Sequence, residues 1–310
     1  MNTQNSAIET PAVVLSPANP SSPARGLLFG AIGVLAFSFT LPFTRVAVET
    51  LDPLFVGAGR AVVAGLLAIA VLAITRQRFP RGMQIVRLLV IAAGVIAGFP
   101  LLTSFAMQTA PASHGAVVIG VLPAATALAA VIRAKERPSR LFWVTSVAGV
   151  IAAIAFVAIS AGGLAGIHAS DLLLLGAVAL AAIGYAEGGM LSRELGSWQT
   201  ICWALVLALP VMLPLTIVSA TSHPVHAGPA GWLAFAYLGV ISMFLGFFAW
   251  YRGLAIGPMA NVSQIQLVQP LLTFAWAVLL FGENLDWRVL VGGIAIIALA
   301  ATAVRARVRT

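Results

Sequence analysis

Two stretches of this sequence share one pattern: "GVLPAATALAAVIRAKE" at residues 120–136 and "LVQPLLTFAWAVLLFGE" at residues 267–283. Each is an apolar run with a proline near its start and a glutamate at its end. A shift of 147 residues places Pro123 on Pro270 and Glu136 on Glu283 without a gap. The pattern indicates a duplicated chain whose two units have the same layout.

The composition indicates a membrane protein. Of 310 residues, 61% are hydrophobic and only 8% are charged, which is too apolar for a soluble domain to cover with a polar surface. A bilayer core of ~30 Å is crossed by about 20 apolar residues in a helix. We therefore predict an all-α integral membrane protein with ten transmembrane helices, over residues 26–47, 54–74, 85–106, 112–132, 141–160, 171–191, 199–219, 230–250, 259–281 and 287–304.

The predicted spans form two units that follow a short N-terminal segment. Residues 1–25 are rich in Ser, Pro and Asn and lack the apolar run of a signal peptide, so we expect a disordered cytoplasmic tail. The first five-helix repeat is predicted over 26–160 and the second over 171–305. Because five is odd, the second repeat enters the membrane from the opposite face. Inverted repeats around a central cavity are typical of secondary transporters that work by alternating access.

The basic residues fix the expected orientation. With both termini in the cytoplasm, the clusters around Arg78, Arg137 and Arg307 all lie on the cytoplasmic side, whereas the other face holds only Arg288. Such a bias follows the positive-inside rule. The net charge of +8 thus reflects the orientation of the chain in the membrane, and we expect no nucleic-acid partner.

The paired blocks and the five-plus-five layout resemble the ten-helix, EamA-type branch of the drug/metabolite transporter superfamily. Within that branch the sequence is similar to the bacterial YddG-type exporters of aromatic amino acids. The resemblance implies export of small metabolites, most of all aromatic or hydrophobic amino acids, across a bacterial inner membrane. It implies no cofactor and no enzymatic step.

Polar residues interrupt the ninth predicted span in "NVSQIQLVQP", which begins at Asn261. Gln269 would lie roughly 15 Å into this span, close to the bilayer midplane. At about 100° per residue, Gln266, Gln269 and Thr273 share one helix face. We expect that face to bind substrate in a polar cavity, with interhelical hydrogen bonding as the alternative. For Asn261 and Gln264, which point elsewhere, the two interpretations are equally supported.

Prolines interrupt several spans. Each lacks an N–H and so frees the carbonyl four residues earlier. Broken helices are tolerated at membrane depth when they are buried in protein or line a cavity. We therefore expect helix breaks around the cavity at Pro42, Pro100, Pro123 and Pro270, with freed carbonyls on Ser38, Ile96, Ile119 and Gln266.

The first repeat has apolar residues where the second has amides: Ile119 and Leu122 correspond to Gln266 and Gln269. The predicted cavity is therefore polar on one wall and apolar on the other, which suits a zwitterion with an apolar side chain. Further candidates for contact with the substrate are Ser38, Phe39, Phe99, Thr103, Ser104, Tyr185 and Trp250. Packing is the alternative role for the aromatic ones, and Trp250 also fits an interfacial anchor beside Arg252.

Three charges lie in or near the spans. We expect Arg45 to snorkel or to pair with Glu49, and Arg60 to pair with Asp52 or to reach the headgroups. Glu187 is predicted close to the cytoplasmic interface, where it either couples transport to protons or is simply solvated.

Other functions are less well supported by the sequence. An organic-cation exporter usually needs a buried carboxylate, a channel needs charged rings, and an intramembrane enzyme or metal site needs clustered catalytic or ligating residues. The expected partners are an amino acid substrate and the lipid bilayer. The pairs Gly94/Gly98 and Gly253/Gly257 permit close helix contact within one chain or between two, so the oligomeric state stays open, with a monomer favoured.

Overall fold

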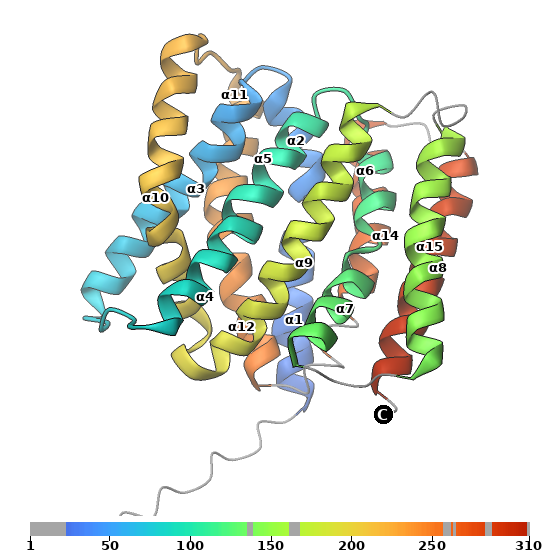
Figure 1. Ribbon diagram of the computed structural model, residues 1–310. Coiled ribbons are helices and arrows are strands. Elements are labelled where there is room, and N and C mark those ends of the chain that lie inside the picture. The colour runs from blue at the N-terminus through green and yellow to red at the C-terminus, as the bar shows by residue number, and fades with distance from the viewer. Residues whose placement is uncertain are drawn as a thin grey trace, which may run out of the picture.

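The computed structural model describes residues 23–134, 139–160, 168–256, 262, 265–282 and 287–308. Within them every regular element is a helix, and the helices stand side by side in one bundle (Figure 1). The elements of the first half are α1 (Pro23–Ser38), α2 (Thr40–Val48), α3 (Pro53–Ile74), α4 (Met83–Ile91), η1 (Ala92–Gly98), α5 (Phe99–Ala106), α6 (Ala112–Ile119), α7 (Leu122–Ala134) and α8 (Arg140–Ser160). Those of the second half are α9 (Ala169–Leu195), α10 (Ser197–Ser222), α11 (Pro229–Ala236), η3 (Tyr237–Leu245), α12 (Gly246–Ile256), η4 (Gln266–Val268), α14 (Gln269–Phe281) and α15 (Trp287–Val308).

Several of these helices are long and apolar enough to cross a membrane. Among the described residues there are 7, namely Ala24–Val48, Pro53–Ile74, Met83–Ala106, Ala112–Arg133, Ala169–Leu195, Ser197–Ser222 and Pro229–Ile256. Shorter apolar stretches lie in α8, α14 and α15. The described part of the chain is therefore all-helical, and its long apolar helices indicate a multi-pass membrane protein.

Helix α1 begins at Pro23, slightly before the expected end of the tail. The rest of that predicted tail, residues 1–22, lies outside the described part of the chain.

The four candidate prolines all lie at the start of a helix. Pro100, Pro123 and Pro270 are the second residues of α5, α7 and α14, and Pro42 is the third residue of α2. The first turn of a helix does not need the N–H that proline lacks. The element before two of these breaks is irregular, since η1 before Pro100 is π-helical and η4 before Pro270 is a 3-10 turn. The spans that carry these prolines are thus two helical segments joined end to end.

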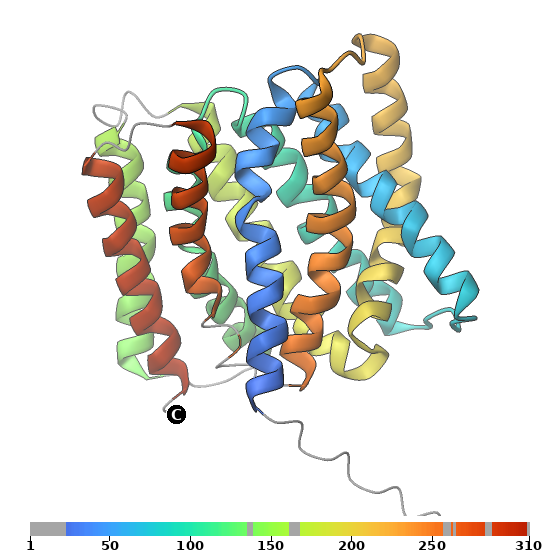
Figure 2. The ribbon, with the colours of Figure 1, turned by 180° about the vertical axis from the view of Figure 1, so that it is seen from behind.

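Glycines allow the two halves to approach closely. Helix α1 lies against α12, as Figure 2 shows from behind, and α9 lies against η1 and α5. A side chain at Gly94 would place its Cβ 2.4 Å from the carbonyl oxygen of Leu180, and one at Gly253 would lie 2.7 Å from the backbone nitrogen of Gly30. Gly94 and Gly253 therefore make close contacts within one chain. Gly257 lies outside the described residues.

Apolar side chains cover the outside of the bundle. The exposed large ones include Leu66, Ile69, Leu213 and Ile217 along the α3–α10 pair and Val144, Val147, Leu290 and Ile294 along the α8–α15 pair. Such a surface suits contact with lipid. Arginines lie beside the helix ends at one end of the bundle, here named the basic end, where α3 and α15 finish (Figure 1): Arg76 follows α3, Arg81 precedes α4 and Arg305 lies in the last turn of α15.

The Gly94 contact gives a test of the packing. Gly94→Ala should lower the free energy of unfolding by about 1–3 kcal/mol, because the added methyl group meets the backbone of α9. Gly149→Ala is the matched control, since its Cβ would lie 3.9 Å from its nearest neighbour on α15. Thermal unfolding of the purified variants in detergent measures both. Equal melting temperatures for wild type and Gly94→Ala would contradict the contact.

Candidate functional site

Two adjoining cavities lie inside the bundle. The larger has about 480 Å³ of unfilled space, counting the part that opens to solvent. Its lining combines polar, aromatic and aliphatic side chains: Phe37, Thr40, Leu41, Arg60, Val95, Phe99, Ile119, Leu122, Tyr185, Ser242, Met243, Phe247 and Gln269. The smaller has about 260 Å³ and is lined by Leu41, Ala116, Ile119, Leu122, Pro123, Gln266, Gln269, Pro270 and Thr273. Shared lining residues join the two cavities into one candidate site.

The predicted amide wall lies at this site. Gln269 lines both cavities, and Gln266 and Thr273 line the smaller one. The Gln266 side chain is only 2% exposed. Its Nε2 and the Oε1 of Gln269 are buried and have no hydrogen-bond partner. Buried polar atoms without partners are uncommon in proteins, so these two atoms are suited to bind a ligand.

The freed carbonyls are less available than the sequence suggested. The hydroxyl of Thr273 donates to the Ser38 carbonyl over 2.8 Å, and the backbone N–H of Gln269 donates to the Gln266 carbonyl. These two carbonyls therefore each accept one hydrogen bond from a neighbouring donor, and one lone pair of each is left for a ligand. Thr273 thus fastens α14 to α1 as well as lining the smaller cavity.

Another part of the lining is apolar. Ile119 and Leu122, which occupy the positions of Gln266 and Gln269 in the first half, line both cavities. They lie at the break between α6 and α7, as the two glutamines lie at the break between η4 and α14. The site therefore has one amide wall and one aliphatic wall.

The aromatic candidates divide into two groups. Phe99 and Tyr185 line the larger cavity, together with Phe37 and Phe247, which the sequence did not single out. Phe39 lies outside both linings and stacks on Trp276 with ring centroids 4.5 Å apart.

Trp250 also lies outside both linings. It is 1% exposed, and its backbone and Cβ lie about 3.0 Å from where a Cβ at Gly33 would be. Its interpretation as an interfacial anchor is therefore wrong. It is a core residue that holds α12 against α1.

The small polar candidates are buried behind the cavity lining. The hydroxyl of Ser38 donates to the Leu35 carbonyl and accepts from the indole nitrogen of Trp276. Thr103 and Ser104 are both fully buried on α5, and the Ser104 hydroxyl has no partner. These three residues support the site instead of lining it. Asn261 and Gln264, the remaining polar candidates, lie outside the described residues.

Arg60 is a further site residue that the sequence interpretation missed. It lies on α3, is 1% exposed and lines the larger cavity. Its predicted partner Asp52 is occupied elsewhere, since that carboxylate accepts from the backbone N–H groups of Leu54 and Phe55. The guanidinium points into the bundle and reaches neither Asp52 nor headgroups. An ionisable residue inside a span is a functional candidate by default, and that signal was present in the sequence.

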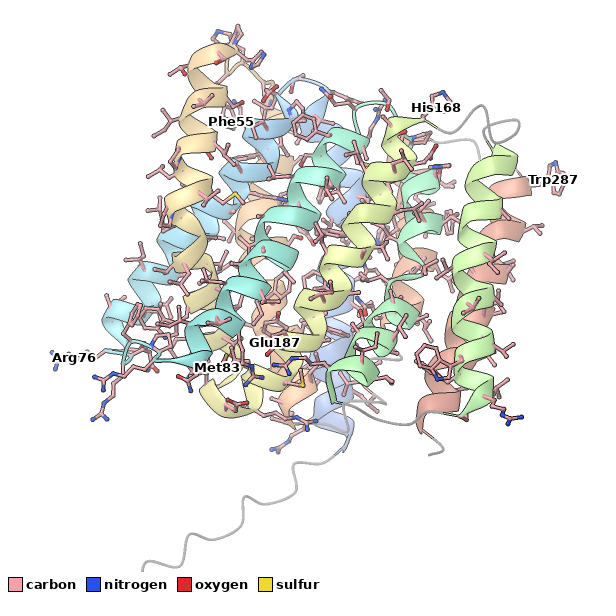
Figure 3. The ribbon with its side chains drawn as sticks, viewed as in Figure 1. Phe55, Arg76, Met83, His168, Glu187 and Trp287 are labelled. Atoms are coloured by element: carbon pink, nitrogen blue, oxygen red, sulfur yellow. The ribbon has the colours of Figure 1, made fainter. Side chains whose placement is uncertain are left out.

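Glu187 lies near the basic end, as Figure 3 shows by its label beside Met83 and at a similar height to Arg76. It is 4% exposed and accepts from the guanidinium groups of Arg87 on α4 and Arg133 on α7. Simple solvation is therefore excluded. The ion pairs join α9 to two helices of the first half.

A second polar contact lies at the opposite end of the bundle, where Figure 3 labels His168. The Nε2 of His114 on α6 lies 2.7 Å from the Oδ1 of Asp171 on α9. The Nη1 of Arg45 donates to the carbonyls of Met107 and Gln108, and its Nε lies 3.9 Å from the predicted partner Glu49. Polar contacts thus join neighbouring helices at both ends, with the cavities between them.

Comparison with known proteins places the chain in a family. The model of the EamA-like transporter family matches residues 24–158 and again residues 168–304. An uncharacterized transporter of Bacillus subtilis (strain 168), YdeK, is 44% identical over 280 residues, which cover 90% of this chain and 97% of that protein. A solved crystal structure of a protein with 19% sequence identity shares the fold with a TM-score of 0.63, covering 93% of this chain and 99% of that one. The chain therefore belongs to the EamA-like transporter family and is a membrane transporter.

Proposed function

We propose that this transporter exports small amino acids with aromatic or other apolar side chains by alternating access. The observation that carries the proposal is the amphiphilic site, in which Gln266 and Gln269 line the same cavity as Ile119 and Leu122. The amide wall suits the polar backbone of an amino acid. The aliphatic wall and the rings of the larger cavity suit its side chain.

Several features support ten spans arranged as two inverted repeats, 26–160 and 171–305. The π-helical segments η1 and η3 correspond at the 147-residue offset, and so do the helix breaks at Gly120 and Leu267. The family model matches each half separately. Helices α8 and α15 have 21 and 22 residues, long enough to cross ~30 Å at 1.5 Å per residue.

The arginines support an orientation with both termini in the cytoplasm of a bacterial cell. Arg76, Arg81 and Arg305 lie beside the ends of α3, α4 and α15 at the basic end of the bundle. Positive charges of this kind stay on the cytoplasmic side of an inner membrane. The cavities then lie between a cytoplasmic basic end and an outer end that carries His168.

The ion pairs of Glu187 support a gate at the basic end. They join α9 to α4 and α7, so they must break when those helices separate. Protonation of the carboxylate would remove the charge that Arg87 and Arg133 bind. Glu187 is thereby placed to couple opening of the cytoplasmic side to a proton.

An organic-cation exporter is the nearest rival within the family. A cation buried in the membrane interior needs a carboxylate as its counter-ion. In the described part of the chain, neither cavity is lined by an Asp or Glu. The site therefore favours a zwitterion, and the transporter family favours transport over an intramembrane reaction.

The substrate class is tested first by uptake into proteoliposomes that contain only this protein. We expect saturable uptake of radiolabelled phenylalanine and tryptophan, weaker uptake of threonine, and none of tetraphenylphosphonium, because the site has an aromatic lining and no carboxylate. Uptake of the cation alone would contradict the proposal.

Gln269→Leu tests the amide wall. The substitution removes a hydrogen-bonding group shared by both cavities and should reduce phenylalanine uptake at least about tenfold, the effect of losing about 1.4 kcal/mol of binding. Gln108→Leu is the control, since its side chain is exposed and outside the site. Uptake kinetics of Gln269→Leu equal to those of the wild type would refute the role of this wall.

Glu187→Gln tests the gate. The variant cannot lose or gain the proton, so phenylalanine uptake should depend less on pH than in the wild type. Glu194→Gln is the matched control, because Glu194 also pairs with Arg87 but its side chain is 51% exposed. An unaltered pH profile in Glu187→Gln would remove the coupling role from this residue.

A further inference from the structure

The larger cavity contains a buried positive charge without a counter-ion among the described residues. The Arg60 side chain is 1% exposed, and no Asp or Glu of the described residues lies within ion-pair distance of it. Its Nη1 and Nη2 reach only the hydroxyls of Thr44 and Thr103, over 3.5 and 3.4 Å. Its Nε has no partner. An arginine stays charged in proteins, and a buried charge without a partner costs several kcal/mol.

The position of Arg60 makes an anion from outside the chain the natural partner. Arg60 is seven residues into α3, roughly 10 Å from the helix start, and lines the larger cavity directly. Its Nε and one terminal nitrogen present a pair of donors. A carboxylate accepts such a pair in a bidentate arrangement, which is the strongest hydrogen bonding that an arginine makes.

The rest of the cavity indicates what the anion is attached to. Gln269 lines the same cavity, and its unpartnered Oε1 is an acceptor suited to an ammonium group. Phe37, Phe99 and Phe247 supply rings for an apolar side chain. The cavity thus offers a cationic donor, a neutral acceptor and an apolar surface, which match the three parts of an apolar amino acid.

We propose that Arg60 is the counter-ion for the carboxylate of the transported solute, so that the solute must carry a carboxylate. The inference rests on the proposed function, because it takes this cavity as the substrate site. It narrows the substrate class to solutes with a carboxylate, a group that the amide wall alone does not require. Esters, amides and decarboxylated amines of the same side chain leave the guanidinium unpaired and are rejected.

Binding to the purified full-length protein tests the inference without transport. A ligand that binds the folded state raises the melting temperature. The probes share one ring and differ in charge: phenylalanine, 3-phenylpropionate, phenethylamine and 3-phenylpropan-1-ol. We expect the two carboxylates to stabilise the wild type and the amine and alcohol to have no effect. The inference would be overturned if phenethylamine stabilised the protein as much as 3-phenylpropionate does. It would also be overturned if neither carboxylate raised the melting temperature.

Variants locate the effect at Arg60. Arg60→Gln should weaken binding of 3-phenylpropionate at least about tenfold, and Arg60→Lys should recover part of it, because lysine keeps the charge but loses the paired donors. Arg45→Gln is the control, since Arg45 bonds to the carbonyls at the end of α5 and lies outside the cavity lining. Unchanged affinity in Arg60→Gln would overturn the inference. If that variant does not fold, the wild-type probe series decides.

The two proposals fail in different ways. If phenylalanine is not taken up but 3-phenylpropionate binds in a manner that depends on Arg60, the amino acid assignment is wrong and the carboxylate site stands. If phenylalanine is taken up by wild type and by Arg60→Gln with equal kinetics, the transport assignment stands and the role of Arg60 is refuted.

Discussion

The bilayer provides no water at its centre, so each polar group buried there needs a partner from the protein or from a ligand. Most of the structure follows this constraint. The hydroxyl of Thr273 binds the Ser38 carbonyl, and the hydroxyls of Thr40 and Ser242 lie 2.7 Å apart between α2 and η3. The polar atoms left without partners then stand out. Those of Arg60, Gln266 and Gln269 lie at the two cavities, where a solute can supply what the chain does not.

Close contact between the halves depends on residues without side chains. The backbones of η1 and α9 touch at Gly94 and Gly184, and those of α1 and α12 touch at Gly30 and Gly253. Burial of apolar surface does not drive helices together in lipid, so close packing at small residues must hold them. Helices that touch at such small residues can slide or separate, whereas the ion pairs of Glu187 are either formed or broken. The proposed alternating-access cycle needs both kinds of contact.

The sequence predicted the helical membrane fold because that prediction rests on composition and run length, which the bilayer thickness sets. It also placed Gln266, Gln269 and Thr273 on one face, since helical periodicity survives a local break. Prediction from the sequence failed where the role of a residue depended on which helix packs against it. The Thr273 hydroxyl donates to the Ser38 carbonyl, and Trp250 packs against Gly33. Neither neighbour can be identified from local spacing in the sequence. Arg60 was assigned to Asp52 by closeness in sequence, but a helix N-terminus had already engaged that carboxylate.

The two buried charges near the site differ in a way that suggests a division of labour. Glu187 lies at the basic end and is bound by two arginines of the first half, so it is satisfied in the conformation described. Arg60 lies deeper and is satisfied only by two distant hydroxyls. A buried charge whose partners belong to the protein stabilises one conformation, and its ion pairs must break before the protein adopts another. A group satisfied by the solute stabilises whichever conformation holds that solute. In the proposed transport cycle, Glu187 acts on the gate and Arg60 on the solute, and a solute that binds Arg60 supplies the binding free energy that an empty cavity lacks.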